Sequence, residues 1–226
     1  MSELIADGAC HTSGGLTRVF HGRAAVERGI FRPTYVVIVG LFDGMGILRM
    51  SAERLGLSIA GYVSCEIDPT AKRVIRLRWP GVVQMGDIRS VMKASVEAVF
   101  KTFAGMDFGV WLGAGSPCQS FSALSRFGQG LDGKKSLLLL EVPRVLHLIS
   151  DVVKRPICWF VENVASMSLK SLRECSLILG CKPYRSCVSD VVHMRRPRLI
   201  WLSHTLVESE KWESVKARIS SVAFHT

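Results

Sequence analysis

Hydrophobic residues fall into two alternating patterns between residues 34 and 203. Continuous runs rich in valine, isoleucine and leucine are typical of strands buried on both faces, and apolar residues at helical spacing are typical of amphipathic helices. The continuous runs predict strands at 34–42, 58–66, 81–87, 107–115, 157–163, 182–192 and 198–203. The periodic segments predict helices at 47–56, 68–79, 90–103, 135–150 and 168–180.

Capping residues mark the ends of several predicted helices. Asp68 followed by Pro69 predicts the start of the second helix, because aspartate caps a helix well and proline fits its first turn. Ser90 predicts the cap of the third helix, and Pro143 predicts a break or kink in the fourth. The last helix is predicted to end at Gly180.

Alternating strands and helices argue for a mostly parallel sheet with helices on both of its faces. The last two strands are joined by too short a segment for a crossover helix, so the last strand is expected to run antiparallel. We predict an α/β protein with a loosely structured lead-in at 1–33, one folded domain at 34–204 and a C-terminal helix or tail at 205–226.

Composition argues against several classes of protein. Apolar residues make up 48% of the chain, but no stretch approaches the ~18 apolar residues of a membrane span. The N-terminus lacks the layout of a secretory signal. The seven cysteines have no regular spacing, which indicates neither a disulfide framework nor a zinc site. We expect an intracellular protein with reduced thiols, no membrane contact and no bound metal.

The formal charge of +10 is concentrated in the second half of the chain. From Ala114 onward there are 16 basic and 9 acidic residues, a net of +7, whereas the preceding part has 13 and 10, a net of +3. A basic half is typical of proteins that bind DNA or RNA, but charge alone does not identify a partner.

Four polar stretches follow predicted strands, at the edge where open parallel sheets bind ligands. In the first, LFDGMG, Gly44 and Gly46 allow a tight turn that a ligand can approach closely. Glu66 ends the next strand and is suited to both ribose hydroxyls of an adenosine cofactor, and Asp87 could reach the adenine amine. The alternative is a glycine turn with a purely structural role.

The second stretch, GSPCQSFS, places Cys118 on the loop after the strand at 107–115. A cysteine there is positioned for nucleophilic attack, and Pro117 stiffens its approach. The alternative is a small hydrophobic side chain buried in the core, which is a common role for free cysteine. The residues alone leave both interpretations open.

The third stretch is acidic and the fourth is basic. In WFVENV, Glu162 and Asn163 follow a buried strand, where a partly desolvated carboxylate can hold a proton near neutrality; the alternative is a helix-capping asparagine beside a solvated acid. In HMRRPRLIW, an extended backbone would turn Arg196 and Arg198 to the same side, with Arg195 beside them. These guanidiniums could orient carboxylates, a phosphate or a base carbonyl, or they could belong to a solvated basic hairpin.

Taken in order, these stretches resemble the motifs of the C5-cytosine DNA methyltransferases. LFDGMG is similar to the cofactor turn of that family, SCEIDPTAKRV to its acidic ribose contact and GDIRSV to its third-strand element. GSPCQSFS is similar to its Pro-Cys loop, FVENV to its Glu-Asn-Val signature and MRRPRLIWL to its basic segment, and RFGQGLDGKKSLLLLEVPRVL matches its glycine–charged–leucine run. The resemblance covers about residues 35–202 and implies the Rossmann-like fold of class I methyltransferases.

The resemblance also implies the chemistry. Cys118 would attack C6 of a flipped cytosine, Glu162 would contact N3 and the exocyclic amine, and a methyl group would pass from S-adenosylmethionine to C5. The implied catalytic residues are Cys118, Glu162, Arg196 and Arg198. The implied cofactor-binding residues are Phe42, Asp43, Gly44, Gly46, Glu66, Ile67, Asp87, Ile88 and Pro117. The implied substrate-binding residues are Ser116, Gln119, Ser120, Asn163 and Arg195.

The sequence departs from the family pattern at several points. No target-recognition region or closing segment is visible after Leu202, Met194 stands where glutamine is usual, and Lys134 and Lys135 replace an arginine. We therefore expect a DNA cytosine-5 methyltransferase, with a tRNA cytosine-5 methyltransferase and a truncated or partner-dependent non-catalytic subunit as alternatives. The expected partners are DNA, or tRNA, and a second chain for target recognition. The expected location is the nucleus of a eukaryote, or otherwise the cytoplasm or nucleoid.

Overall fold

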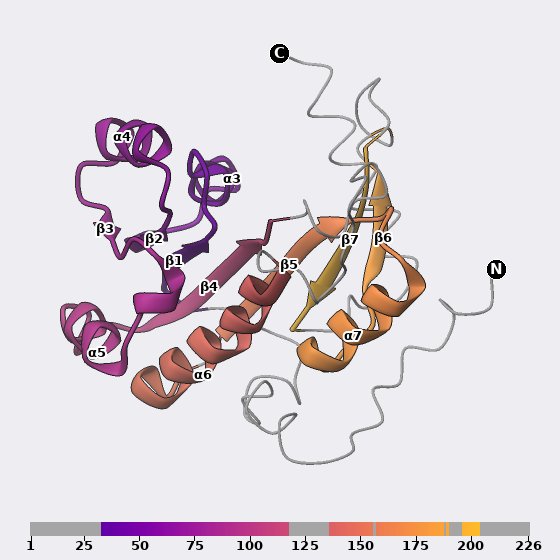
Figure 1. The fold of residues 1–226 in the computed structure, drawn as a ribbon. Helices are drawn as coiled ribbons and strands as arrows, with labels where there is room; N and C mark the ends of the chain where they lie inside the picture. The colour runs from indigo at the N-terminus through magenta and orange to yellow at the C-terminus, as the bar shows by residue number, and fades with distance from the viewer. Residues whose placement is uncertain (1–32, 118–135, 156, 188, 190–195, 204–226) are drawn as a thin grey trace.

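The computed structural model describes residues 33–117, 136–155, 157–187, 189 and 196–203 (Figure 1). These residues form a seven-stranded sheet in the order β3-β2-β1-β4-β5-β7-β6. Each strand overlaps one of the predicted runs. The strands are β1 (Tyr35–Leu41), β2 (Ile59–Cys65), β3 (Val83–Gln84), β4 (Phe108–Gly115), β5 (Ile157–Val164), β6 (Tyr184–Cys187) and β7 (Pro197–Leu202).

Strand directions agree with the prediction. The pairs β1–β2, β1–β4, β2–β3 and β4–β5 are parallel, whereas β7 runs antiparallel to both β5 and β6. In the parallel region Leu41 lies opposite Ala114, and Gly115 lies opposite Glu162. The carboxyl ends of β1, β4 and β5 therefore lie side by side at one edge of the sheet.

Helices cover both faces of the sheet (Figure 1). They are α3 (Ile47–Arg54), α4 (Pro69–Arg78), α5 (Lys93–Lys101), α6 (Glu141–Val153) and α7 (Leu169–Leu179), with short 3-10 helices η1 (Ile88–Ser90) and η3 (Ser136–Leu140). One hydrophobic cluster joins α5, α6 and α7 to one face of the sheet. A smaller cluster, built around Val36, Ile38, Ala52, Tyr62 and Ile75, joins α3 and α4 to the opposite face.

Two of the predicted helix boundaries need correction. Ser90 does not cap α5, because it belongs to η1; α5 begins after Met92, where the Ser95 hydroxyl accepts from the Met92 amide and donates to its carbonyl. The break predicted near Pro143 occurs before Glu141, where η3 ends and α6 begins. Pro143 therefore lies in the first turn of α6, where its missing N–H leaves no hydrogen bond unmade. The predicted Asp68 cap is confirmed, because its carboxylate accepts from the Ala71 amide at 2.7 Å.

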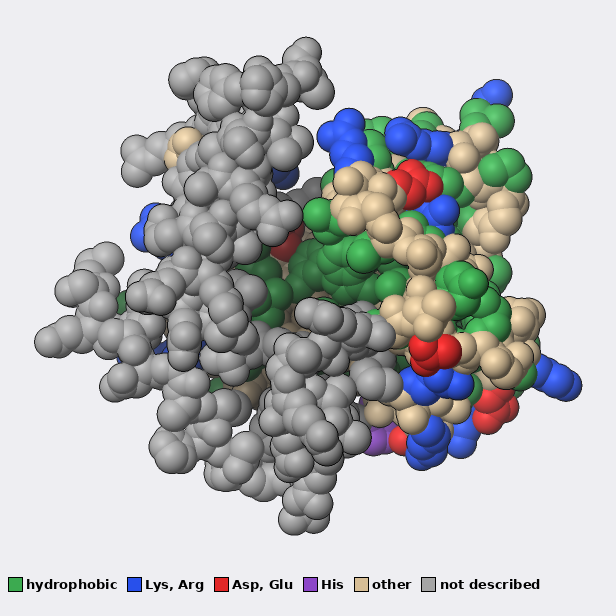
Figure 2. Space-filling model, turned by 180° about the vertical axis from the view of Figure 1, so that it is seen from behind, with side chains coloured by type: hydrophobic (Ala, Val, Ile, Leu, Met, Phe, Trp, Pro, Cys, Tyr) green, Lys and Arg blue, Asp and Glu red, His purple; other side chains and the backbone are tan. Residues whose placement is uncertain are grey.

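The predicted lead-in and C-terminal helix lie almost entirely outside the described residues. Within the described part of the chain, no helix is long and apolar enough to cross a membrane. Of its cysteines, Cys65, Cys158 and Cys175 are free thiols. Seen from behind, hydrophobic side chains are visible in the middle of the described surface, and Lys and Arg side chains lie farther up on the same face (Figure 2).

Candidate active site

The 42–46 turn follows β1 at the carboxyl edge of the sheet. Phe42, Gly44 and Gly46 have φ angles of 54°, 55° and 77°, so the turn has a left-handed backbone that glycine adopts readily and phenylalanine rarely does. The Phe42 amide donates to the Cys65 carbonyl at 2.9 Å, which joins the turn to the end of β2. A Cβ built on Gly44 would meet no described atom within 4 Å, so a ligand can approach the turn closely there.

Glu66 is held by three backbone amides at the end of β2. Its Oε2 accepts from the Gly44 amide at 2.8 Å, and its Oε1 accepts from the Ile67 and Asp68 amides at 2.8 Å each. A carboxylate offers about four acceptor sites. At least one site therefore remains for a ligand hydroxyl on this half-buried group. The next residue, Ile67, is 68% exposed, so its side chain is available to pack against a flat ring.

Asp43, in contrast, turns its carboxylate inward. Its Oδ2 accepts from the Tyr62 hydroxyl, and the carboxylate lies over Gly40 of β1. Burial raises the pKa of Asp43, and the negative charge of Glu66 raises it further, whereas the Tyr62 and Ser64 hydroxyls lower it. Burial and the nearby Asp43 carboxylate also raise the pKa of Tyr62. The predicted contact of Asp43 with a cofactor can therefore come from its backbone, since its side chain is used within the protein.

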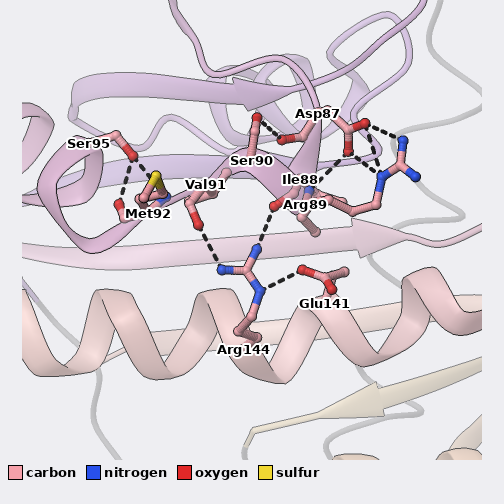
Figure 3. A network of polar contacts seen from close by, with 9 residues as sticks. All are labelled: Asp87, Ile88, Arg89, Ser90, Val91, Met92, Ser95, Glu141 and Arg144. Carbon is pink, nitrogen blue, oxygen red and sulfur yellow. Dashed lines mark hydrogen bonds and ion pairs between the residues drawn. The ribbon is translucent and has the colours of Figure 1, made fainter.

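The loop after β3 is fixed by an arginine from α6 (Figure 3). The Arg144 guanidinium donates to the Ile88 carbonyl at 2.6 Å and to the Val91 carbonyl at 2.7 Å, and it pairs with Glu141 at 2.5 Å. The Ile88 side chain is buried in the core, so its predicted cofactor contact is restricted to its backbone. Asp87 accepts hydrogen bonds from the guanidinium and from the amide of Arg89, and these hydrogen bonds lower the pKa of Asp87.

Asn163 anchors the start of the Pro-Cys loop. Its Nδ2 donates to the Ser116 hydroxyl at 2.9 Å and lies 3.4 Å from the Ser116 carbonyl, while its Oδ1 accepts from the Val164 amide at 2.8 Å. Both Asn163 and Ser116 are buried, so this contact fixes the chain at Ser116. Their contact with a substrate stays a prediction. Pro117 follows at the sheet edge, half-buried. The predicted residues Cys118, Gln119, Ser120 and Arg195 lie outside the described residues.

Glu162 and two arginines line one pocket of about 270 Å³ together with Ser186 and Ile200. Glu162 of β5 forms an ion pair with Arg198 of β7, and Arg198 also donates to the Pro197 carbonyl at 3.0 Å. Arg196 lines the same pocket, as the extended-backbone argument predicted. This face of β5 lies opposite the one that packs on α6 and α7. A carboxylate paired with one guanidinium, in an open pocket that a second guanidinium also lines, can bind the polar edge of a base.

Two residues that sequence reasoning missed support the site. Tyr62 lies inside β2, where a buried aromatic residue looks like an ordinary core residue. Arg144 lies in an amphipathic helix and contacts carbonyls 53 and 56 positions earlier in the chain, a distance that local patterns do not report. Among the described residues, no group of three or more His, Cys, Asp or Glu side chains could hold a metal ion.

Comparisons with known proteins find relatives of this chain. A family model described as C-5 cytosine-specific DNA methylase matches residues 36–179, more than half of the chain. The chain is 26% identical over 135 residues to the DNA (cytosine-5)-methyltransferase DRM1A of Oryza sativa subsp. japonica, covering 57% of this chain and 28% of that protein. It is 32% identical over 134 residues to the type II methyltransferase M2.BsuMI of Bacillus subtilis (strain 168), covering 58% and 29%. The chain thus spans less than a third of the length of these relatives.

The structure of the S. pombe Dnmt2 methyltransferase is similar to this one, with a TM-score of 0.51 at 18% identity. The match covers 74% of this chain and 49% of that chain. At this identity the likeness shows the fold.

Proposed function

Because the chain belongs to the C-5 cytosine-specific DNA methylase family and has the Rossmann-like class I methyltransferase fold, we propose that it methylates C5 of cytosine in DNA. The observation that carries the proposal is the pocket shared by Glu162, Arg196 and Arg198. This pocket lies at the same edge of the sheet as the 42–46 turn, because Gly115 is opposite Glu162 and Leu41 is opposite Ala114. Acting on DNA, the protein would work in a nucleus or nucleoid.

The residues at the carboxyl edge fit S-adenosylmethionine. Glu66 retains an acceptor site for the ribose hydroxyls, the open side of Gly44 admits close approach, and exposed Ile67 can pack on the adenine. The Ile88 backbone and Asp87 follow β3 and would lie beside the adenine of the bound cofactor. The bound cofactor would supply the electrophilic methyl group.

The side chains of the chain itself would prepare the base. The Cys118 thiolate would form a bond to C6 of a flipped cytosine, which makes C5 nucleophilic. Glu162 would hold N3 and the exocyclic amine as charge develops on the ring, with Arg198 keeping the carboxylate in place. After methylation, loss of the C5 proton would break the bond to sulfur and restore the ring. Asn163 would contribute by fixing Ser116, two positions before Cys118.

A covalent trap tests this proposal. Fluorine at C5 cannot leave as a proton does, so duplex DNA that carries 5-fluoro-2′-deoxycytidine and S-adenosylmethionine should give a protein–DNA adduct that survives denaturation. Cys118→Ser should give no adduct, whereas the matched control Cys187→Ser should give as much as the wild type. Equal adduct from Cys118→Ser and the wild type would refute the mechanism. Adduct with 5-fluorocytosine tRNA and none with DNA would replace DNA by tRNA as the substrate.

A further inference from the structure

The Asp43 carboxylate occupies an interior position directly beneath the 42–46 turn. It accepts from the hydroxyl of Tyr62, which is 97% buried within β2, since only 3% of that residue is exposed. A Cβ built on Gly40 would lie 2.1 Å from Asp43 Oδ1, so any larger residue at position 40 would displace the carboxylate. The absent side chain at Gly40 therefore makes room for a carboxylate that points into the sheet.

Tyr62 also supports the far end of the same turn. A Cβ on Gly46 would lie 2.8 Å from the Tyr62 hydroxyl oxygen and 2.4 Å from Trp79 Cζ3. The rings of Tyr62 and Trp79 pack edge to face at 5.5 Å, and the Arg49 guanidinium lies 5.9 Å from the Tyr62 ring centre. The Tyr62 hydroxyl therefore donates to Asp43 and lies where a side chain at position 46 would stand.

The backbone of the turn depends on where Asp43 lies. The Gly46 amide donates to the Asp43 carbonyl at 3.0 Å, and the Asp43 amide makes a long bond of 3.4 Å to the Cys65 carbonyl. Gly44, the next residue, donates its amide to Glu66. A shift of Asp43 would therefore move the amide that orients the proposed ribose-binding carboxylate. Phe42 has a positive φ, a backbone conformation that is unfavourable for phenylalanine, so contacts around the turn have to maintain it.

We propose that Tyr62 is a positioning residue for the cofactor: its hydroxyl holds Asp43 and thereby fixes the 42–46 turn and Glu66 in the geometry that binds S-adenosylmethionine. The inference rests on the proposed function, because it assumes that this turn binds that cofactor. It assigns the Asp43 side chain to the protein interior and assigns the contact with ligand to the turn backbone and Glu66.

Binding of S-adenosylhomocysteine, measured by calorimetry, tests the proposal without requiring catalysis. Tyr62→Phe should raise the dissociation constant about tenfold, because the Asp43 carboxylate loses the hydrogen bond from the Tyr62 hydroxyl and is no longer held at that oxygen. Tyr35→Phe, the same change at an exposed position of β1, should leave binding unchanged. Ile75→Val, a small deletion in the hydrophobic cluster that contains Tyr62, controls for general loss of stability. It should lower the unfolding temperature without weakening binding.

Variants of Asp43 separate positioning from packing. Asp43→Asn keeps an acceptor for the Tyr62 hydroxyl and should bind more tightly than Asp43→Ala, which should match Tyr62→Phe. The double variant Tyr62→Phe/Asp43→Ala should bind no worse than Asp43→Ala alone, because both changes remove the same hydrogen bond.

If the wild type binds S-adenosylhomocysteine and Tyr62→Phe binds it equally well, the inference is wrong but the proposed function stands. The same holds if the losses of affinity in the double variant are fully additive. A wild-type chain that binds no S-adenosylhomocysteine would instead remove the proposed function, and this inference with it.

Discussion

Replacing Arg144 by methionine should strongly destabilise the protein, because one side chain joins α6 to the loop after β3. The guanidinium makes hydrogen bonds of 2.6 and 2.7 Å to the carbonyls of Ile88 and Val91 and an ion pair of 2.5 Å with Glu141 (Figure 3). Methionine keeps much of the apolar stem but none of the donors. The two carbonyls would then depend on water for a partner.

The size of the effect follows from these three contacts. A hydrogen bond to a charged group contributes about 1.5–3 kcal/mol when buried. The Arg144 side chain is 37% exposed, so solvent screening reduces the total, and we expect a loss of about 2–4 kcal/mol. For a domain of this size such a loss lowers the unfolding temperature by about 5–12 °C.

Urea unfolding followed by circular dichroism measures this loss, with Arg89→Met as the matched control. Arg89 pairs with Asp87 inside its own turn and its side chain is 67% exposed. The control should therefore cost much less than Arg144→Met, because solvent screens an exposed ion pair. A loss for Arg144→Met within error of the loss for Arg89→Met would refute the claim that Arg144 fixes this loop.

Two further predictions concern buried titratable groups. Because burial raises the pKa of Asp43 above its unfolded value, the folded protein holds that proton more tightly, and its contribution to stability is lost as pH rises through the folded pKa. We therefore expect the free energy of unfolding of the wild type minus that of Asp43→Asn, measured in urea between about pH 4.5 and 8, to fall as pH rises and then to level off. A difference that grows with pH would contradict this. Burial also raises the pKa of Cys65 and Cys175 to about 12. At about pH 8 roughly one thiol in ten thousand is then ionised. Iodoacetamide should therefore leave both cysteines unmodified in the folded protein and label both in urea, as measured by mass spectrometry. Rapid labelling of either cysteine in the folded protein would count against its burial.

The strands and helices could be predicted because their signals are local. Buried parallel strands carry continuous apolar runs, and Asp68 reports its own cap through a contact three residues away. The wrong assignment of Ser90 shows the limit of such signals. A serine is an equally good candidate wherever it precedes an apolar run, and the η1 turn that contains Ser90 depends on Arg144, more than fifty positions later.

The inward direction of Asp43 had no local signal either. Asp43 and Glu66 are both acids at the ends of neighbouring strands, and both resembled ligand contacts in the sequence. Pairing of β1 with β2 decides between them, because it places Tyr62 beneath the 42–46 turn and leaves Glu66 facing backbone amides. The register of β1 and β2 thus determines that Glu66, and not Asp43, remains accessible to a ligand.

Glu162 and Asn163 are neighbours in the sequence, but they have different roles because they lie on opposite faces of β5. Adjacent residues of a strand face opposite sides, so Glu162 faces the pocket with Arg198 while Asn163 is buried and holds Ser116. Trp159 and Val161 share the buried side with Asn163 and fix the register through their packing in the core. A slip by one residue would bury an acid among apolar groups and release the loop that leads to Cys118. The hydrophobic face of β5 therefore selects the register that makes the proposed chemistry possible.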